Sequence, residues 1–181
     1  MTLPGLLTPE DLIDQPDWSR CLPAHVLASL PPDGVTVFAV SDDASDTAAF
    51  SARYGFGLDD CANTLVLRYK AAGAEHLAAL VGLASRRLDI NGAVKAALGA
   101  QRISFAKRED AVALSRMAFG AITAFGLPAA WPVLVDAAVM DRPAVVMGAG
   151  IREAKLLLAP QRLHSLPTLR VAALSSPAQA S

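Results

Sequence analysis

The sequence predicts a main domain of the α/β class, of the α+β type, in which helices surround a mixed, mostly antiparallel β-sheet or partial barrel. Short apolar runs rich in β-branched residues recur along the chain and indicate strands. The segments between these runs alternate irregularly between helical patterns and tight turns, whereas a doubly wound fold requires a regular alternation of strand and helix. A length of 181 residues suits one ordinary domain. We therefore expect a sheet with interspersed helices rather than a Rossmann fold.

The charge and hydropathy of the chain argue against several classes of protein. Its 16 basic and 17 acidic residues give a net charge of −1, so the chain lacks the strong positive field of proteins that coat long nucleic acid, and any nucleic-acid contact should be local. The mean hydropathy is +0.38, yet no window reaches the ~18 uninterrupted apolar residues of a membrane span. The N-terminus has no basic region before an apolar one, as a signal peptide requires. We expect a cytoplasmic protein that binds no membrane.

The cysteine and histidine residues indicate neither a metal centre nor a disulfide framework. Cys21 and Cys61 form no CxxC motif, and the pattern favours Cys61 as a small buried hydrophobic residue. His25, His76 and His164 lie in dissimilar contexts, and no GxSxG nucleophile motif accompanies them. We expect no metal and no cofactor.

Residues 1–34 are expected to form an N-terminal helical extension. Thr8 is placed to cap a helix that has Pro9 in its first turn, and Pro16 ends it. Residues 24–30 read as a second short helix, because a Pro-Pro-Asp-Gly turn follows them.

The strand that organises the chain is expected at residues 63–69, where an apolar, β-branched run is entered through the neutral amide of Asn63. A turn near Gly73 should join it to a second strand at 76–83 in a hairpin. Two elements should precede this hairpin, namely a strand at 35–40 and a helix at 47–54 that Ser45 or Asp46 caps.

Shorter elements should complete a main domain that spans residues 35–166. The expected elements are helices at 90–98, 107–117 and 160–166 and strands at 102–105, 132–136, 144–147 and 155–158. The remaining residues, 167–181, are small and polar near their end and are expected to form a loose tail.

Two glycine-bearing segments are the candidate binding elements. The loop from Gly120 to Gly126 and the turn from Gly148 to Gly150 can bring backbone N–H groups against a ligand carbonyl or phosphate. The alternative is that these glycines only make tight turns. A dinucleotide fingerprint is disfavoured, because Arg152 and Glu153 stand where a later glycine would be needed and a strand is expected to follow.

Several weak motifs, taken in order, resemble the YbaK/EbsC-like family, relatives of the editing domain inserted in bacterial prolyl-tRNA synthetases. The resemblance covers roughly residues 35–166 and depends on the order and spacing of the motifs. The matching features are the helix at 46–55, Asn63-Thr-Leu-Val-Leu, Leu88-Asp89 with the helix that follows to Ala97-Leu-Gly-Ala100, Gly120-Ala-Ile-Thr-Ala-Phe-Gly126, Val133-Leu-Val-Asp136, and Gly148-Ala-Gly150 leading into Leu156-Leu-Leu158.

The resemblance implies a fold like that of the prolyl-tRNA synthetase-associated domain and a cytoplasmic, metal-free trans-editing enzyme. Such an enzyme hydrolyses the ester that joins a wrongly attached amino acid to the 3′ end of a tRNA. The implied partner is the aminoacylated 3′ end, with a tRNA synthetase or an elongation factor as a further candidate. Asn63 occupies the position of the family's catalytic lysine. The implied substrate-binding residues are Leu65, Gly120, Ile122, Thr123, Phe125, Gly126, Asp136, Gly148, Gly150 and Lys155.

Two departures from the family pattern affect the predicted activity. Asn63 stands where many members have Lys, and Ala124 stands where many have Pro. A neutral amide forms hydrogen bonds about half as strong as those of an ammonium. Lys155, beside the Gly150 turn, is either a substitute cation or a solvated surface lysine.

The residues allow two functions of different classes. The first is an aminoacyl-tRNA deacylase, in which backbone N–H groups stabilise the oxyanion and a water or the substrate's own ribose hydroxyl attacks the ester. In this hypothesis Asn63 positions the ligand, and Asp136 shapes the pocket or holds the amino group of the amino acid. The second is a non-catalytic module that binds aminoacyl-tRNA or nucleotide ends. A DNA-binding protein is disfavoured, because Arg86-Arg87 and Lys107-Arg108 read as solvated ends of elements.

Overall fold

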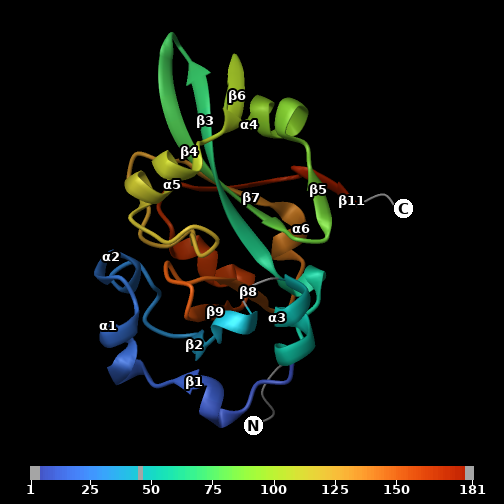
Figure 1. Ribbon diagram of the computed structural model, residues 1–181. Coiled ribbons are helices and arrows are strands. Elements are labelled where there is room, and N and C mark those ends of the chain that lie inside the picture. The colour runs from blue at the N-terminus through green and yellow to red at the C-terminus, as the bar shows by residue number, and fades with distance from the viewer. Residues whose placement is uncertain (1–4, 45–46, 178–181) are drawn as a thin grey trace.

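The computed structural model of the chain describes residues 5–44 and 47–177. It confirms the predicted fold class: helices and loops surround mixed and antiparallel sheets that do not close into a barrel (Figure 1). The helix cap predicted at Ser45 or Asp46 lies outside the described residues.

The larger sheet of the described chain has five strands in the order β10-β7-β4-β3-β6. Its centre is the predicted hairpin, because β3 (Ala62–Ala71) pairs antiparallel with β4 (Ala74–Leu83). Ala72 and Gly73 join the two strands, both with positive φ (49° and 81°), as a tight two-residue hairpin turn requires. The strands that flank the hairpin are β6 (Arg102–Phe105), β7 (Val133–Asp136) and β10 (Leu169–Ala172).

The smaller sheet has the order β1-β2-β9-β8, and all its pairs are antiparallel. Its strands are β1 (Leu12–Ile13), β2 (Val35–Ala39), β8 (Val145–Gly148) and β9 (Ala154–Leu158). A bridge between Cys61 and Val146 brings the start of β3 against β8. This contact joins the two sheets. It lies just before β3 and within β8, two residues before Gly148, where the glycine-bearing turn begins.

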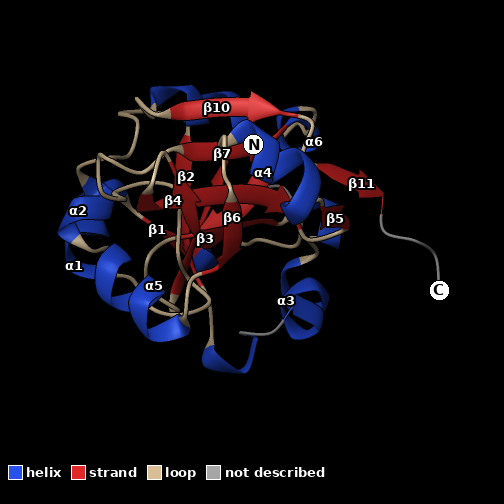
Figure 2. Cartoon of the chain, turned by 90° about the horizontal axis from the view of Figure 1, so that it is seen from above, coloured by secondary structure: helices blue, strands red, loops and turns tan. Residues whose placement is uncertain are grey.

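The helices are short and lie around the sheets (Figure 2). The α-helices are α1 (Trp18–Cys21), α2 (Ala24–Leu27), α3 (Thr47–Tyr54), α4 (Lys95–Ala97), α5 (Arg108–Ser115) and α6 (Ala137–Met140). The other helical turns are η1 (Pro9–Asp11), η2 (Gln15–Asp17), η3 (Asp42–Ala44), η4 (Leu58–Asp60), η5 (Ile90–Val94) and η6 (Pro160–Ser165). Across residues 5–44 and 47–177, every helix is too short or too polar to span a bilayer.

Two predicted helices differ from the structure. The helix expected to run from Thr8 to Pro16 is one 3₁₀ turn, because β1 follows at once and pairs with β2. The helix expected at 90–98 begins as the π-turn η5. The carboxylate of Asp89 accepts hydrogen bonds from the N–H groups of Gly92 and Ala93 at 3.0 and 2.9 Å and fixes this first turn.

The N-terminal residues pack on the same core as the strands. Trp18, Leu22 and Val26 are buried in one cluster with residues of β7 and β9. The indole N–H of Trp18 also donates to the carbonyl of Ile13 at 2.8 Å. Figure 1 shows this segment below the hairpin, next to β1, β2 and β9.

The expected loose tail after residue 167 is wrong for the residues that the structure describes. Residues Leu169–Ala172 form β10, which pairs parallel with β7, and β11 (Ser175–Pro177) pairs with β5 (Arg86–Leu88). Leu174 between them is only 1% exposed. The small residues Ala and Ser near the end of the chain do not indicate strands. The two short strands are stabilised by tertiary contacts rather than by local propensity.

Candidate functional site

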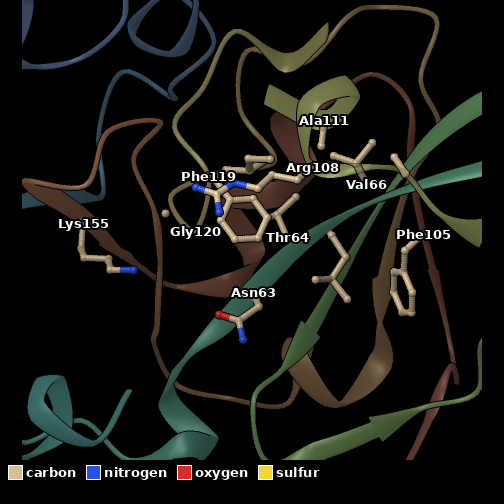
Figure 3. A pocket seen from close by; sticks show the side chains of 13 residues that line it. Asn63, Thr64, Val66, Phe105, Arg108, Ala111, Phe119, Gly120 and Lys155 are labelled. Carbon is tan, nitrogen blue, oxygen red and sulfur yellow. The ribbon is translucent and has the colours of Figure 1, made fainter. Parts of the chain in front are cut away.

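A pocket of about 530 Å³ opens where β3, the loop after α5 and the β8–β9 pair meet (Figure 3). The end of β6 and helix α5 also contribute, so segments distant in sequence build one site. The pocket is lined by Asn63, Thr64, Leu65, Val66, Phe105, Ala106, Arg108, Ala111, Phe119, Gly120, Ile122, Gly148 and Lys155.

The start of β3 supplies the polar side chains of one wall. Asn63 is exposed, and its amide forms no hydrogen bond within the described residues. Thr64 is 8% exposed, and its hydroxyl is buried without a hydrogen-bond partner in the described chain. An unpaired buried hydroxyl is unfavourable, so Thr64 retains an unused hydrogen-bonding group at the pocket wall.

Residues 118–122, here called the 118–122 loop, form the opposite wall and are held by the turn after β8. The N–H of Ala118 donates to the carbonyl of Gly150 at 2.9 Å, and the N–H of Gly150 donates to the carbonyl of Ala121 at 2.7 Å. Gly148 allows this approach: a Cβ there would lie 2.4 Å from the Ala121 oxygen. A side chain at this position would therefore push the loop away.

Gly120 lies at the exposed part of this loop. Its φ is +79°, a conformation that L side chains rarely adopt. Within the described chain, the N–H groups of Phe119 and Gly120 form no hydrogen bonds. They remain available to a ligand oxygen.

Lys155 brings a positive charge from β9 to the pocket. It pairs with Gly148 across the β8–β9 ladder, and its ammonium lies 5.7 Å from the ring centroid of Phe50. Burial lowers the pKa of the Lys155 ammonium below the ordinary value of a lysine. The nearby Cys61 supplies no counter-charge, because burial raises the pKa of its thiol. Lys155 is thus a half-buried cation rather than a solvated surface lysine.

Arg108 is the second cation of the pocket. Its guanidinium lies over the ring of Phe119, 4.3 Å from the centroid, in the range of a cation–π contact. Figure 3 shows both side chains between Lys155 and Phe105.

The charges of the pocket are of one sign. Lys155 and Arg108 make no ion pair within the described residues, and the pocket lining contains no carboxylate. By contrast, the nearby Arg68 pairs with Asp110 at 2.8 Å and with Glu75 at 3.2 Å. A pocket with two unpaired cations favours an anionic ligand.

The structure brings six of the predicted site residues together and separates the other five from them. The residues that line the pocket are Asn63, Leu65, Gly120, Ile122, Gly148 and Lys155. The residues that do not line it are Thr123, Phe125, Gly126, Asp136 and Gly150. Thr123 and Phe125 are fully buried in the core, and Gly126 packs against the backbone of His25. Gly150 acts indirectly, since it anchors the 118–122 loop.

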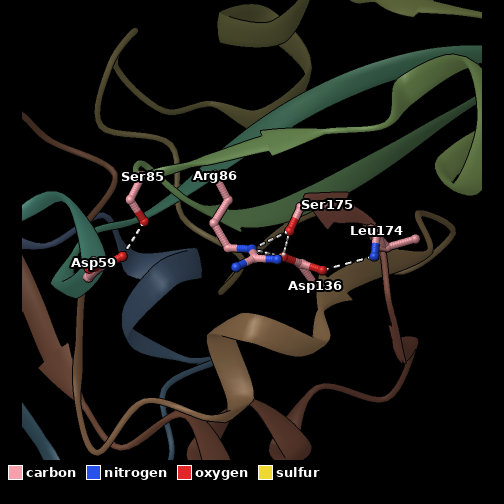
Figure 4. Close-up of polar contacts among 6 residues, drawn as sticks. All are labelled: Asp59, Ser85, Arg86, Asp136, Leu174 and Ser175. Atoms are coloured by element: carbon pink, nitrogen blue, oxygen red, sulfur yellow. Dashed lines mark hydrogen bonds and ion pairs between the residues drawn. The ribbon is translucent and has the colours of Figure 1, made fainter. Parts of the chain in front are cut away.

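Asp136 belongs to a separate polar network at the end of β7 (Figure 4). Its carboxylate accepts hydrogen bonds from the N–H of Leu174 at 2.8 Å and from the hydroxyl of Ser175, and it lies 3.8 Å from the Arg86 guanidinium. Arg86 also donates to the Ser175 hydroxyl at 2.6 Å. The residue predicted to shape the pocket instead fixes residues 174–175 to the larger sheet.

Sequence reasoning missed seven residues of the pocket. The sequence pattern favours Arg108 as a solvated end of an element, and Phe119 lies one residue before the predicted glycine loop at 120–126. The others are Thr64, Val66, Phe105, Ala106 and Ala111. The available signal was the position of Arg108 at the start of α5 and of Phe119 after its end, next to the glycine loop. For metal ligation, the described residues contain no group of three His, Cys, Asp or Glu side chains suited to hold an ion.

The fold and the pocket define an α+β domain with a cationic, partly apolar site. The family model of the aminoacyl-tRNA editing domain matches residues 41–166. The chain belongs to this family, which confirms the predicted relationship to YbaK-like proteins. No curated protein matches the chain.

Solved structures share the fold. A protein described as a proposed trans-editing enzyme for prolyl tRNA synthetase superposes with a TM-score of 0.69 at 19% identity, over 78% of this chain and 87% of that chain. The hypothetical protein APE2540 superposes with a TM-score of 0.68 at 23% identity, over 77% of this chain and 90% of that chain. At these identities the likeness shows the fold alone.

Proposed function

We propose that this protein is an aminoacyl-tRNA deacylase that acts in trans. The observation that carries the proposal is a pocket within an aminoacyl-tRNA editing domain that holds two unpaired cations and no carboxylate among its described lining residues. The end of an aminoacylated tRNA is a polyanion that carries a neutral ester, and such a pocket suits it. Its encounter with the substrate would occur in the cytoplasm, on free tRNA or on tRNA held by a synthetase or an elongation factor.

Lys155 compensates for the missing family lysine in this mechanism. Asn63 offers only neutral hydrogen bonds at the family position, whereas Lys155 reaches the same pocket from β9. Its charge acts in a partly buried site, where electrostatic interactions are stronger than in water. The ammonium binds an oxygen of the terminal nucleotide, and the Asn63 amide orients the ester beside it.

The 118–122 loop supplies the groups that stabilise the transition state. A water adds to the ester carbonyl carbon and makes its oxygen anionic, and the proton that the water loses passes to the ribose oxygen when that oxygen leaves. Attack by the neighbouring ribose hydroxyl would only transfer the acyl group to that hydroxyl. The free N–H groups of Phe119 and Gly120 donate to this oxyanion. The bond from the carbonyl carbon to the ribose oxygen then breaks. With water as nucleophile, the products are the free amino acid and a tRNA with a restored hydroxyl.

The inner part of the pocket receives the amino acid. Val66, Ala111 and Ile122 make it apolar, and the Thr64 hydroxyl is its unpaired polar group. This surface fits a small amino acid whose amino group donates to Thr64.

Incubation with a panel of mischarged tRNAs tests the proposal. We expect release of the amino acid from at least one of them faster than from the tRNA alone. If the protein deacylates none of the mischarged tRNAs, the enzyme assignment is overturned. The second candidate, a non-catalytic binding module, is favoured by one observation, namely the neutral Asn63 at the position of the family lysine.

A further inference from the structure

The rim of the pocket differs from its interior in exposure and in chemistry. Phe119 is 50% exposed and Phe105 is 58% exposed, whereas Thr64, Ala111 and Ile122 are buried. From this contrast we infer that Phe119, backed by Arg108, is the stacking surface for the nucleobase of the nucleotide that carries the ester. The identity of that nucleotide rests on the proposed function, but the stacking surface itself does not.

The Phe119 ring is already held in place for stacking. The two hydrogen bonds between Gly150 and the 118–122 loop fix the backbone on both sides of Phe119. The Arg108 guanidinium covers one face of the ring at 4.3 Å, and half of the residue's surface is still exposed. Because the ring is fixed before binding, a base that stacks on its open face orders few additional protein groups.

A nucleobase fits this position better than an amino acid side chain. The amino acid of a small substrate enters the buried apolar part, which leaves the rim for the nucleoside. A volume of 530 Å³ lies in the range of about 300–1,000 Å³ that holds ligands larger than one amino acid. Arg108 makes no ion pair with any described residue, so it can bind the phosphate of the nucleotide whose base stacks on Phe119.

The test uses adenosine 5′-monophosphate as a probe, because it contains the base and phosphate of a terminal nucleotide but no ester. Amide NMR of the whole protein follows binding of the monophosphate through the chemical shift of Gly120, which is next to Phe119 in the chain. Ribose 5-phosphate lacks the base and isolates the phosphate contribution. Phenylalaninamide carries an aromatic side chain without a nucleotide. It tests the alternative that the Phe119 ring binds the side chain of an aromatic amino acid rather than a nucleobase.

We expect the monophosphate to shift the Gly120 resonance and to bind about tenfold more weakly to Phe119→Leu, since this variant loses the stacking of the base on an aromatic ring. Phe119→Trp retains a ring and should keep the affinity. Arg108→Gln should weaken binding, whereas Arg170→Gln, which removes an exposed arginine of β10 outside the pocket, should not.

Three results would overturn the inference: equal affinities for the monophosphate and ribose 5-phosphate, an unchanged affinity in Phe119→Leu, or displacement of the monophosphate by phenylalaninamide at comparable concentration. The outcome is separable from that of the proposed function. A protein inactive on every mischarged tRNA refutes deacylation and leaves the probe titration valid. An active enzyme with an unchanged KM in Phe119→Leu refutes the stacking surface alone.

Discussion

Gly148 and Lys155 are direct partners across β8 and β9, and both line the pocket. Side chains of an antiparallel pair lie on the same face of the sheet. The missing side chain of Gly148 therefore lets the 118–122 loop lie beside Lys155, and the ammonium and the free N–H groups of the loop meet in one site. This pair places the Lys155 cation beside the glycine-bearing turn. Asn63 lines the same pocket but is neutral, so it does not supply this charge.

The first prediction concerns the stability contribution of Lys155. The Lys155 ammonium is half-buried and has no counterion among the described residues, and such a charge is destabilising. Lys155→Met removes the charge and keeps a similar apolar chain, so we expect the free energy of unfolding to rise by about 0.5–2 kcal/mol, the range of single stabilising substitutions. Urea denaturation at neutral pH measures it. A loss of stability in this variant would show that Lys155 has a favourable partner.

The second prediction is the titration of Lys155. Its lowered pKa means that the folded protein releases this proton at a pH where the unfolded chain still holds it. Stability should therefore rise with pH across the window just below the ordinary lysine value. The chain has only four lysines, so carbon-13 NMR of their ε-methylenes can follow Lys155, assigned by its loss in Lys155→Met. Titration in the folded state at or above the value seen in urea would contradict the burial of this charge.

The third prediction separates backbone strain from function. Gly120 and Gly73 have nearly the same φ, +79° and +81°, and no atom of the described residues lies within 4 Å of a Cβ at either position. Gly120→Ala and Gly73→Ala should each destabilise the protein by about 1–2 kcal/mol. Only Gly120→Ala should slow deacylation, because only Gly120 lines the pocket. Equal activity losses in the two variants, measured on folded protein, would exclude a role for Gly120 beyond its turn.

The fourth prediction concerns Asp136. The residue is 1% exposed, and its carboxylate accepts hydrogen bonds from Leu174 and Ser175. Asp136→Ala should destabilise the protein by about 2–3 kcal/mol, since it leaves buried donors unpaired. The control Asp33→Ala removes an exposed ion pair with Arg162 and should change stability by less than about 1 kcal/mol.

Removal of residues 174–181 supplies a double-mutant cycle for the same network. Truncation and Asp136→Ala should be less than additive, because they remove the same hydrogen bonds. Full additivity would mean that Asp136 does not act through residues 174–175.

The fifth prediction distinguishes the enzyme from a binding module at Asn63. Asn63→Ala removes the amide that orients the ester, so an editing enzyme should lose turnover while its fold is unchanged. Single-turnover deacylation measures it, with Asn63→Lys in parallel. Turnover that appears only in Asn63→Lys would favour the non-catalytic module, since restoring the family ammonium would then create the activity.

Local patterns were sufficient to predict the hairpin. The β-branched run after Asn63, the Ala72-Gly73 turn and the following apolar run each indicate the same structure, and the register of β3 and β4 confirms it. The two short strands β10 and β11 could not be predicted from local sequence. β10 is stabilised by pairing with β7, β11 by pairing with β5, and the segment between them by the buried Leu174.

The candidate site was predictable only in part for the same reason. Asn63, Gly120 and Gly148 followed from the motif order. The loop that carries Phe119 is held by Gly150, a contact between residues far apart in sequence, and Arg108 reaches the pocket by its contact with the Phe119 ring. Asp136 ends a strand, as a site residue can, but its partners Leu174 and Ser175 lie in a segment expected to be loose.

The most direct test of the account compares two lysine variants on a mischarged tRNA that the wild-type protein deacylates. We predict that Lys155→Met lowers kcat/KM by at least about tenfold, the scale of losing one charged group at a reacting centre. Lys70→Met, which removes an exposed lysine of β3 outside the pocket, should leave kcat/KM unchanged. Equal kcat/KM values for wild type and Lys155→Met would contradict the claim that this lysine supplies the charge of the site.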